Sequence, residues 1–62
     1  MKLNYTEKYG SVVYVDLMNV PAEMSREEII EEARDHVGVH ETLTVESLEW
    51  VNTHRVSVRF TL

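Results

Sequence analysis

Residues 24–38, MSREEIIEEARDHVG, decide the fold because they carry the strongest local signal in the chain. Ser25 is a good N-cap residue, and Glu28 stands three positions later, so the two make the S-x-x-E capping box. Gly38 suits the left-handed residue that commonly follows a helix. The stretch therefore predicts one helix of about three turns, from residue 26 to residue 37.

The same stretch has an apolar face at helical spacing. Met24 and Ile29 are placed to form a hydrophobic staple across the start of the helix. Four apolar side chains share one stripe of the helix: Ile29, Ile30, Ala33 and Val37. We expect this stripe to pack against a sheet.

A hairpin is predicted before the helix. Residues 11–18, SVVYVDLM, are rich in β-branched and aromatic side chains and are typical of a strand. Residues 2–7, KLNYTE, alternate more weakly, with Leu3 and Tyr5 on one side. Gly10 lies between the two runs and suits a turn.

A second hairpin is predicted after the helix. The last strand has the cleanest alternation, and its inward side chains are expected to be Val56, Val58, Phe60 and Leu62. The strand before it changes parity between Val45 and Leu48, and a β-bulge at residues 46–47 would return its apolar residues to one face. A loop at residues 52–54 then pairs Trp50 with Val56, Leu48 with Val58, Val45 with Phe60, and Leu43 with Leu62. We therefore expect Trp50 and Phe60 to lie in the core.

These elements predict a single α+β domain over residues 1–62. The element order is β-β-α-β-β, with one helix packed on one face of a four-stranded, antiparallel-rich sheet. A right-handed crossover permits the spatial strand order 1-2-4-3.

Composition limits the classes of function. Eleven acidic and six basic residues give a net charge of −5, which weighs against direct binding to a nucleic-acid backbone. There is no cysteine, so disulfides are excluded and the redox compartment is not constrained. The sequence has no apolar run of membrane-spanning length and no secretory h-region, so we expect a cytoplasmic protein without membrane contact, while a mature secreted form stays open.

Catalysis is not indicated by any motif. The sequence lacks nucleophile-elbow, zinc-protease, P-loop and dinucleotide-binding patterns, so we expect no enzyme, no catalytic residue and no cofactor. His36 and His40 have the spacing of a helical metal pair, but Gly38 should end the helix between them. We expect ordinary surface histidines and no metal site, with weak zinc binding beside Asp35 and Glu41 as the alternative.

Two surfaces are candidates for binding a partner. The first is the acidic side of the helix, with Glu27, Glu31, Glu32 and Asp35. A solvated face that aids solubility is the favoured interpretation of these acids, and a surface for a basic partner is the alternative. The second is the sheet face away from the helix. If Val13, Val15 and Leu17 face the helix, the opposite face carries Val12, Tyr14 and Met18.

The C-terminal run HRVSVRFTL, residues 54–62, following a strand-loop-helix arrangement, is similar to dodecins. These are small flavin-binding oligomers with β-α-β-β order. The likeness covers about the last 50 residues; the helix here is shorter, a strand precedes it, and the final loop is tighter. The resemblance implies an oligomeric flavin binder in which Trp50 corresponds to a flavin-stacking tryptophan.

The leading hypothesis is a small acidic, non-enzymatic protein-interaction module that acts as a regulator or inhibitor. Its partner would be another protein with a basic surface. A narrower version is an acidic decoy for a nucleic-acid-binding protein, of the general kind encoded by phages, although no residue motif identifies one. The dodecin-like flavin binder is the alternative, and an engineered or purely structural domain is a third. The sequence leaves homo-oligomerisation open.

Overall fold

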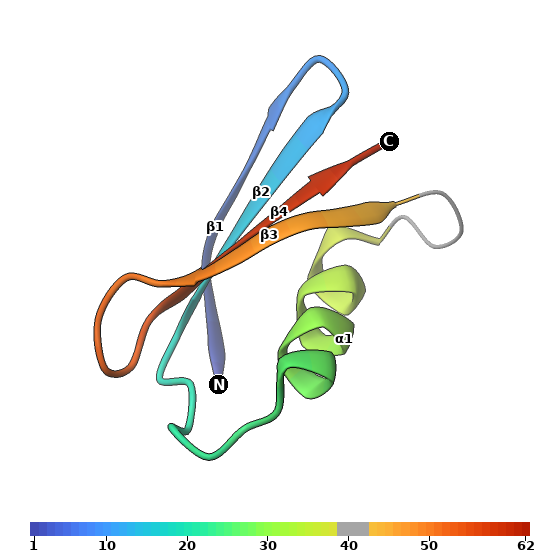
Figure 1. The fold of residues 1–62 in the computed structure, drawn as a ribbon. Coiled ribbons are helices and arrows are strands. Elements are labelled where there is room, and N and C mark those ends of the chain that lie inside the picture. Colours follow the sequence, from blue (N-terminus) through green and yellow to red (C-terminus); the bar gives the residue numbers. More distant parts are fainter. Residues whose placement is uncertain (39–42) are drawn as a thin grey trace.

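The computed structural model describes residues 1–38 and 43–62. Its elements follow in the order β1 (Lys2–Tyr9), β2 (Val12–Met18), α1 (Arg26–Val37), β3 (Thr44–Trp50) and β4 (Val56–Thr61). The four strands form one sheet in the order β1-β2-β4-β3, and each neighbouring pair is antiparallel. Figure 1 shows α1 on one side of this sheet. The predicted α+β class, element order and strand order are confirmed.

The helix begins and ends where its caps predict. The Ser25 hydroxyl accepts a hydrogen bond from the Glu28 amide at 3.2 Å, and the Glu28 carboxylate accepts one from the Ser25 amide at 3.1 Å. These two bonds satisfy amides that the helix itself leaves free. The hydrogen bond from the Ser25 amide to the Glu28 carboxylate, followed by the contribution of the Ser25 side chain, lowers the pKa of Glu28 from its ordinary value. Gly38 has a φ of 74°, the left-handed conformation expected after the last turn.

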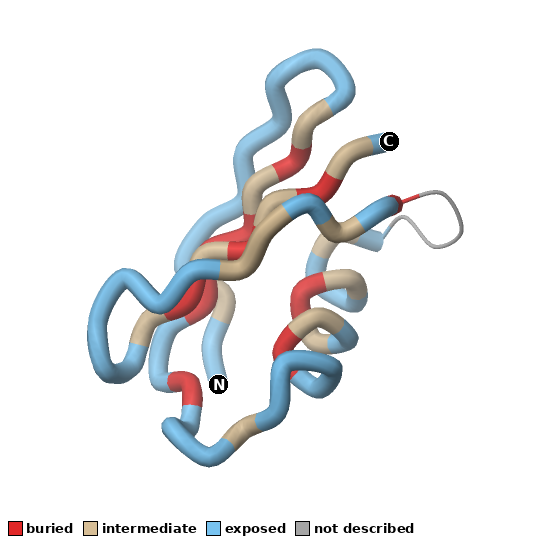
Figure 2. Tube along the Cα trace, viewed as in Figure 1, coloured by how far each residue is buried: buried red, intermediate tan, exposed pale blue. Residues whose placement is uncertain are grey.

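The core lies between α1 and one face of the sheet. Ile29 and Ala33 supply the buried residues of α1, and Met24, Ile30 and Val37 pack around them. The buried apolar residues of the rest of the described chain are Val13, Val15, Leu17, Val20, Leu43, Val56, Val58 and Phe60. In Figure 2 the buried segments lie along the strands and on the helix turns that face them.

The bulge in the second hairpin is confirmed. Val45 pairs with Phe60 and Leu48 with Val58, and the register shifts between Val45 and Ser47. The extra residue changes which positions of β3 point toward the helix, so apolar side chains from both halves of the strand lie on the same face. The Val51 amide donates to the Arg55 carbonyl at 2.8 Å and closes the loop.

Leu62 departs from the prediction. It was expected to point inward opposite Leu43, but half of its surface is exposed, at 50%. Its amide donates a hydrogen bond to the Ser11 carbonyl in the turn between β1 and β2, at 2.8 Å. This backbone bond, and not packing in the core, therefore holds the last residue. The pairing of β3 with β4 begins at Thr44 and Thr61.

Trp50 is the larger correction. Its register with Val56 is as predicted, yet 42% of its surface is exposed, whereas Val56 is fully buried. Trp50 ends an edge strand, and it lines a shallow hollow with Ala22, Asn52 and Thr53 instead of packing under the helix. The predicted face was therefore right, and the expected burial was wrong.

The two aromatic residues should consequently differ in their effect on stability. Phe60→Ala should lower the free energy of unfolding by about 3–5 kcal/mol, because Phe60 is fully buried. Trp50→Ala should cost clearly less. Chemical denaturation of both variants measures the difference. Trp50 is the single tryptophan of the chain, so its emission should peak near that of indole in water. Equal losses together with blue-shifted emission would contradict this placement.

No helix in the described part of the chain has the length and apolar character needed to cross a membrane.

Candidate functional site

A register shift in β1 determines which of its side chains lie on the sheet face away from α1. Leu3 pairs with Leu17, but Tyr5 pairs with Asp16, so the register shifts at Asn4. The shift sends Leu3 toward the core and Tyr5 to the open face. The expectation that Leu3 and Tyr5 share one side is therefore wrong.

All three tyrosines of the chain come together on this open face. The tight turn at Gly10 and Ser11 pairs Tyr9 with Val12, which sets Tyr9 diagonally across from Tyr14. The rings of Tyr9 and Tyr14 meet edge to face, with centroids 6.2 Å apart and an angle of 75° between their planes. Tyr5 and Tyr9 are exposed at 41% and 63%.

These side chains line a hollow of about 510 Å³, which we call the tyrosine hollow. Its lining residues are Tyr5, Glu7, Tyr9, Val12, Tyr14 and Ser57. The Tyr9 hydroxyl donates a hydrogen bond to the Glu7 carboxylate. That bond, together with the negative charge of Glu7, raises the pKa of Tyr9 above its ordinary value. The phenol therefore stays protonated at neutral pH.

Two sets of charged side chains lie near the hollow. The Arg59 guanidinium lies over the Tyr14 ring, 5.6 Å from its centroid, and its Nε is 3.5 Å from a Glu46 carboxylate oxygen. Farther along β2, the Asp16 carboxylate is almost fully buried, at 1% exposure. Its Oδ2 accepts hydrogen bonds from Arg55 Nε and Asn4 Nδ2, both at 2.8 Å. The same contact with Asp16 raises the pKa of Arg55.

The Asp16 cluster, which consists of Asp16, Asn4 and Arg55, divides the predicted open-face patch. Val12 and Tyr14 line the tyrosine hollow, while Met18 lies beyond Asp16 on the same strand. Met18 lines a separate hollow with Asn19, His54 and other loop residues. The three predicted residues share a face but do not form one continuous surface.

The Asp16 cluster should respond asymmetrically to substitution. Removing Arg55 as Arg55→Leu leaves a buried carboxylate with Asn4 alone, whereas removing the charge as Asp16→Asn leaves a partly exposed arginine that water can solvate. Arg55→Leu should therefore lower the free energy of unfolding more than Asp16→Asn. In Arg55→Leu/Asp16→Asn the second change should recover part of the loss. Denaturation at pH 7 measures the cycle, and strictly additive losses would contradict the coupling.

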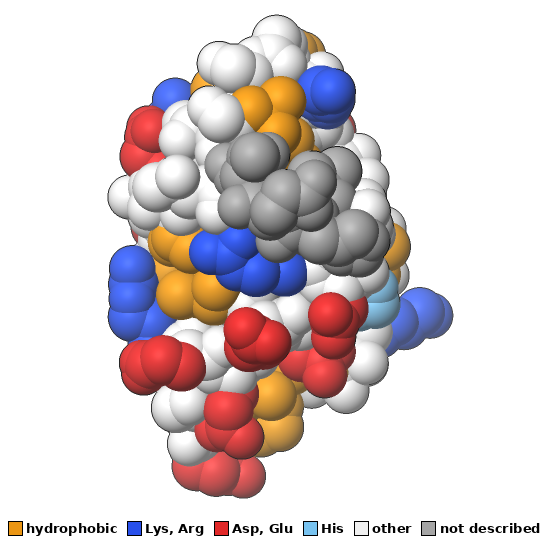
Figure 3. All heavy atoms as spheres, turned by 90° about the vertical axis from the view of Figure 1, so that its right-hand side faces the viewer, with side chains coloured by type: hydrophobic (Ala, Val, Ile, Leu, Met, Phe, Trp, Pro, Cys, Tyr) orange, Lys and Arg blue, Asp and Glu red, His pale blue; other side chains and the backbone are white. Residues whose placement is uncertain are grey.

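The acidic side of α1 keeps its charge uncompensated. Glu27, Glu31 and Asp35 are exposed and Glu32 is half-buried. Neither of the two ion pairs formed within residues 1–38 and 43–62 involves these carboxylates. Figure 3, which views the α1 side, shows acidic side chains gathered over the lower half of this face.

Arg34 stands three positions after Glu31 on α1 but forms no ion pair with it. Instead its Nη1 donates to the Leu43 carbonyl at 2.6 Å, and its guanidinium lies 5.4 Å from the centroid of the Phe60 ring. The arginine therefore connects α1 to the start of β3 and contributes no ion pair to the acidic side.

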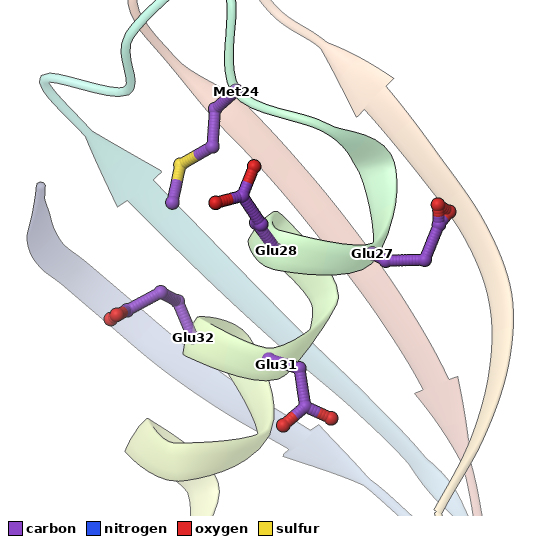
Figure 4. Close-up of a pocket in the computed structure, with 5 residues that line it drawn as sticks. All are labelled: Met24, Glu27, Glu28, Glu31 and Glu32. Atoms are coloured by element: carbon purple, nitrogen blue, oxygen red, sulfur yellow. The ribbon is translucent and has the colours of Figure 1, made fainter.

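The acidic side chains do not converge on one point. Figure 4 shows the carboxylates of Glu27 and Glu32 on opposite sides of the helix, with Glu28 beside Met24. Among the residues that the structure describes, no three His, Asp or Glu side chains are grouped so as to hold a metal ion. His36 is exposed, and His40 and Glu41 lie outside the described residues. The arrangement suits a diffuse charged surface and not a chelating site.

Comparison with models of known protein families, with curated proteins and with solved structures finds no match to this chain.

Proposed function

We propose that this chain is a small acidic protein-interaction module without catalytic activity of its own. It acts as a regulator or inhibitor and binds another protein through a basic surface of that partner. The observation that carries the proposal is the open sheet face, where three tyrosines and Val12 line one hollow that no helix of the described residues covers.

Tyrosine content supports an interface on this face. Tyrosine and arginine are enriched at the centres of protein interfaces, because each combines a large contact area with a polar group. The open face carries both, with Tyr14 beneath Arg59 and the Asp16 cluster fixing the neighbouring strands. A rigid sheet presents these groups without the entropic cost of ordering a loop.

Charge supports a basic partner. Glu27–Glu31 and Glu31–Asp35 are like-charge pairs at i,i+4, each of which costs a few tenths of a kcal/mol in the free protein. A positive surface would relieve that repulsion and speed association. In the narrower form of this proposal, the partner's basic surface is a nucleic-acid-binding groove and the acidic side of α1 occupies it as a decoy.

The acidic side of α1 can be tested by combining Glu31→Gln, Glu32→Gln and Asp35→Asn. The free fold should be unchanged or slightly more stable, because like-charge repulsion is removed. A partner captured by affinity pull-down should associate more slowly with this triple variant, and the difference should shrink at high salt. Stopped-flow association at low and high salt measures it. Glu28 is left intact because its capping bonds would confound stability with binding.

A matched control is Glu23→Gln, which removes an exposed carboxylate outside the helix. Glu23→Gln should slow association by less than one third of the effect of the triple variant, which removes three charges. Equal association rates for the triple variant and the wild type at low salt would show that the acidic side of α1 only faces solvent. Partner binding would then be assigned to the open sheet face.

A second candidate is the dodecin-like flavin binder, and one observation favours it. Trp50 is exposed beside a hollow of about 230 Å³ lined also by Ala22, Asn52 and Thr53. An isoalloxazine ring would find an indole face there on which to stack.

Titration with riboflavin or FMN tests this candidate. Binding should quench flavin fluorescence in the wild type, Trp50→Phe should retain part of the quenching, and Trp50→Ala should lose it. A light-scattering mass shows whether the chain assembles into an oligomer. Absence of quenching at tens of micromolar protein, together with a monomeric mass, would remove the flavin candidate.

A further inference from the structure

We infer that the tyrosine hollow receives an arginine side chain from the partner protein, held between the exposed rings of Tyr5 and Tyr9 and the carboxylate of Glu7. This inference rests on the proposed function, to which it adds a contact point and the chemistry of the group that is bound.

The rings provide the aromatic part of the site. Tyr5 and Tyr9 come from β1, and Tyr14 comes from β2, so the hollow has walls on two neighbouring strands. The Tyr9 and Tyr14 planes are inclined at 75° and therefore form two different walls instead of a stack. The face of an aromatic ring attracts a cation placed within about 6 Å of its centroid.

The chain's own arginines illustrate the chemistry. Arg59 lies over Tyr14 at 5.6 Å, and Arg34 lies over Phe60 at 5.4 Å. In this protein a guanidinium beside an aromatic face therefore already occurs on both sides of the sheet. Tyr9, which is 63% exposed, has no such cation within the described residues.

Glu7 supplies the charge. The two arginines on the open face are already engaged, Arg55 with Asp16 and Arg59 with Glu46. Glu7 has no cationic partner among residues 1–38 and 43–62, and its bond with the Tyr9 hydroxyl holds it at the wall of the hollow. The site thus combines aromatic faces with an uncompensated carboxylate, in a chain whose net charge is −5.

Arginine fits this combination better than lysine. A planar guanidinium can stack on a ring and still present a fork of N–H groups, which lie in its own plane, to a carboxylate beside the ring. An ammonium group is a compact and strongly hydrated charge, so it gives up more solvation to lie on an aromatic face. The Ser57 hydroxyl at the edge of the hollow offers a further acceptor.

The direct test uses a capped pentapeptide with arginine at its centre and glycine elsewhere. Matched peptides carry lysine or glutamine at the same position. Titration is followed by NMR through the ring signals of Tyr5, Tyr9 and Tyr14 and the β1 amides. We expect the arginine peptide to bind most tightly, the lysine peptide more weakly, and the glutamine peptide not at all.

Three variants separate cation binding from simple apolar contact. Tyr9→Phe keeps the ring face but loses the bond that holds Glu7 at the wall, so it should bind the arginine peptide less tightly than the wild type. Tyr9→Leu keeps apolar volume without the ring and should bind more weakly still, by about two- to fivefold relative to the wild type. Glu7→Gln should also weaken binding. Glu23→Gln, which removes an exposed carboxylate between β2 and α1, is the matched control and should have little effect. Unchanged amide spectra outside the hollow confirm that each variant folds.

Equal weakening by Tyr9→Leu and Tyr9→Phe, or equal binding of the glutamine and arginine peptides, would overturn the inference. So would a dimer that forms at the same concentrations and is abolished by Tyr9→Leu, because a second copy would then occupy the hollow. If the arginine peptide does not bind while the helix triple variant still slows partner association, this inference fails and the proposed function stands. If the peptide binds but no protein partner does, the proposed function fails instead.

Discussion

The twelve-residue helix α1 packs on one face of the four-stranded sheet, and no helix of residues 1–38 and 43–62 covers the other face. The face toward α1 is accordingly filled with Val13, Val15 and Phe60, all buried. The side chains of the open face must instead cover the sheet and still expose polar groups to water. Tyrosine and arginine do both, because each combines an apolar body with a polar end.

The Asp16 cluster follows from the same constraint. A carboxylate that is 1% exposed on an otherwise open face is costly unless it is paired and hydrogen-bonded. Asn4 of β1 and Arg55, which directly precedes β4, satisfy this need from either side of β2, so the cluster also links β1 and the start of β4 to β2. The register shift that frees Leu3 for the core is the same one that brings Asn4 to Asp16.

Local chemistry predicted most of the fold. The limits of α1 depend on the capping residues Ser25, Glu28 and Gly38, whose bonds are made within the segment itself. The bulge near Ser47 could be predicted because both strands of that hairpin carry clear apolar alternation, and one parity change has one simple repair. The exposure of Trp50 could not be predicted in this way. It depends on how far α1 reaches over the sheet, which is a property of tertiary packing.

The candidate site was predicted in part. Tyr14 was placed on the open face, but Tyr5 was misplaced by the unforeseen shift at Asn4, in a strand too weakly patterned to reveal it. Tyr9 could have been found: a tight turn at Gly10 pairs it with Val12 and so sets it beside Tyr14. The acidic side of α1 and the tyrosine hollow lie on opposite sides of the sheet, in a protein that measures 29 × 18 × 17 Å. At physiological salt the Debye length is about 8 Å, so charge on one face is largely screened at the other. If both proposed surfaces bind, a partner that contacts both must extend around an edge of the sheet.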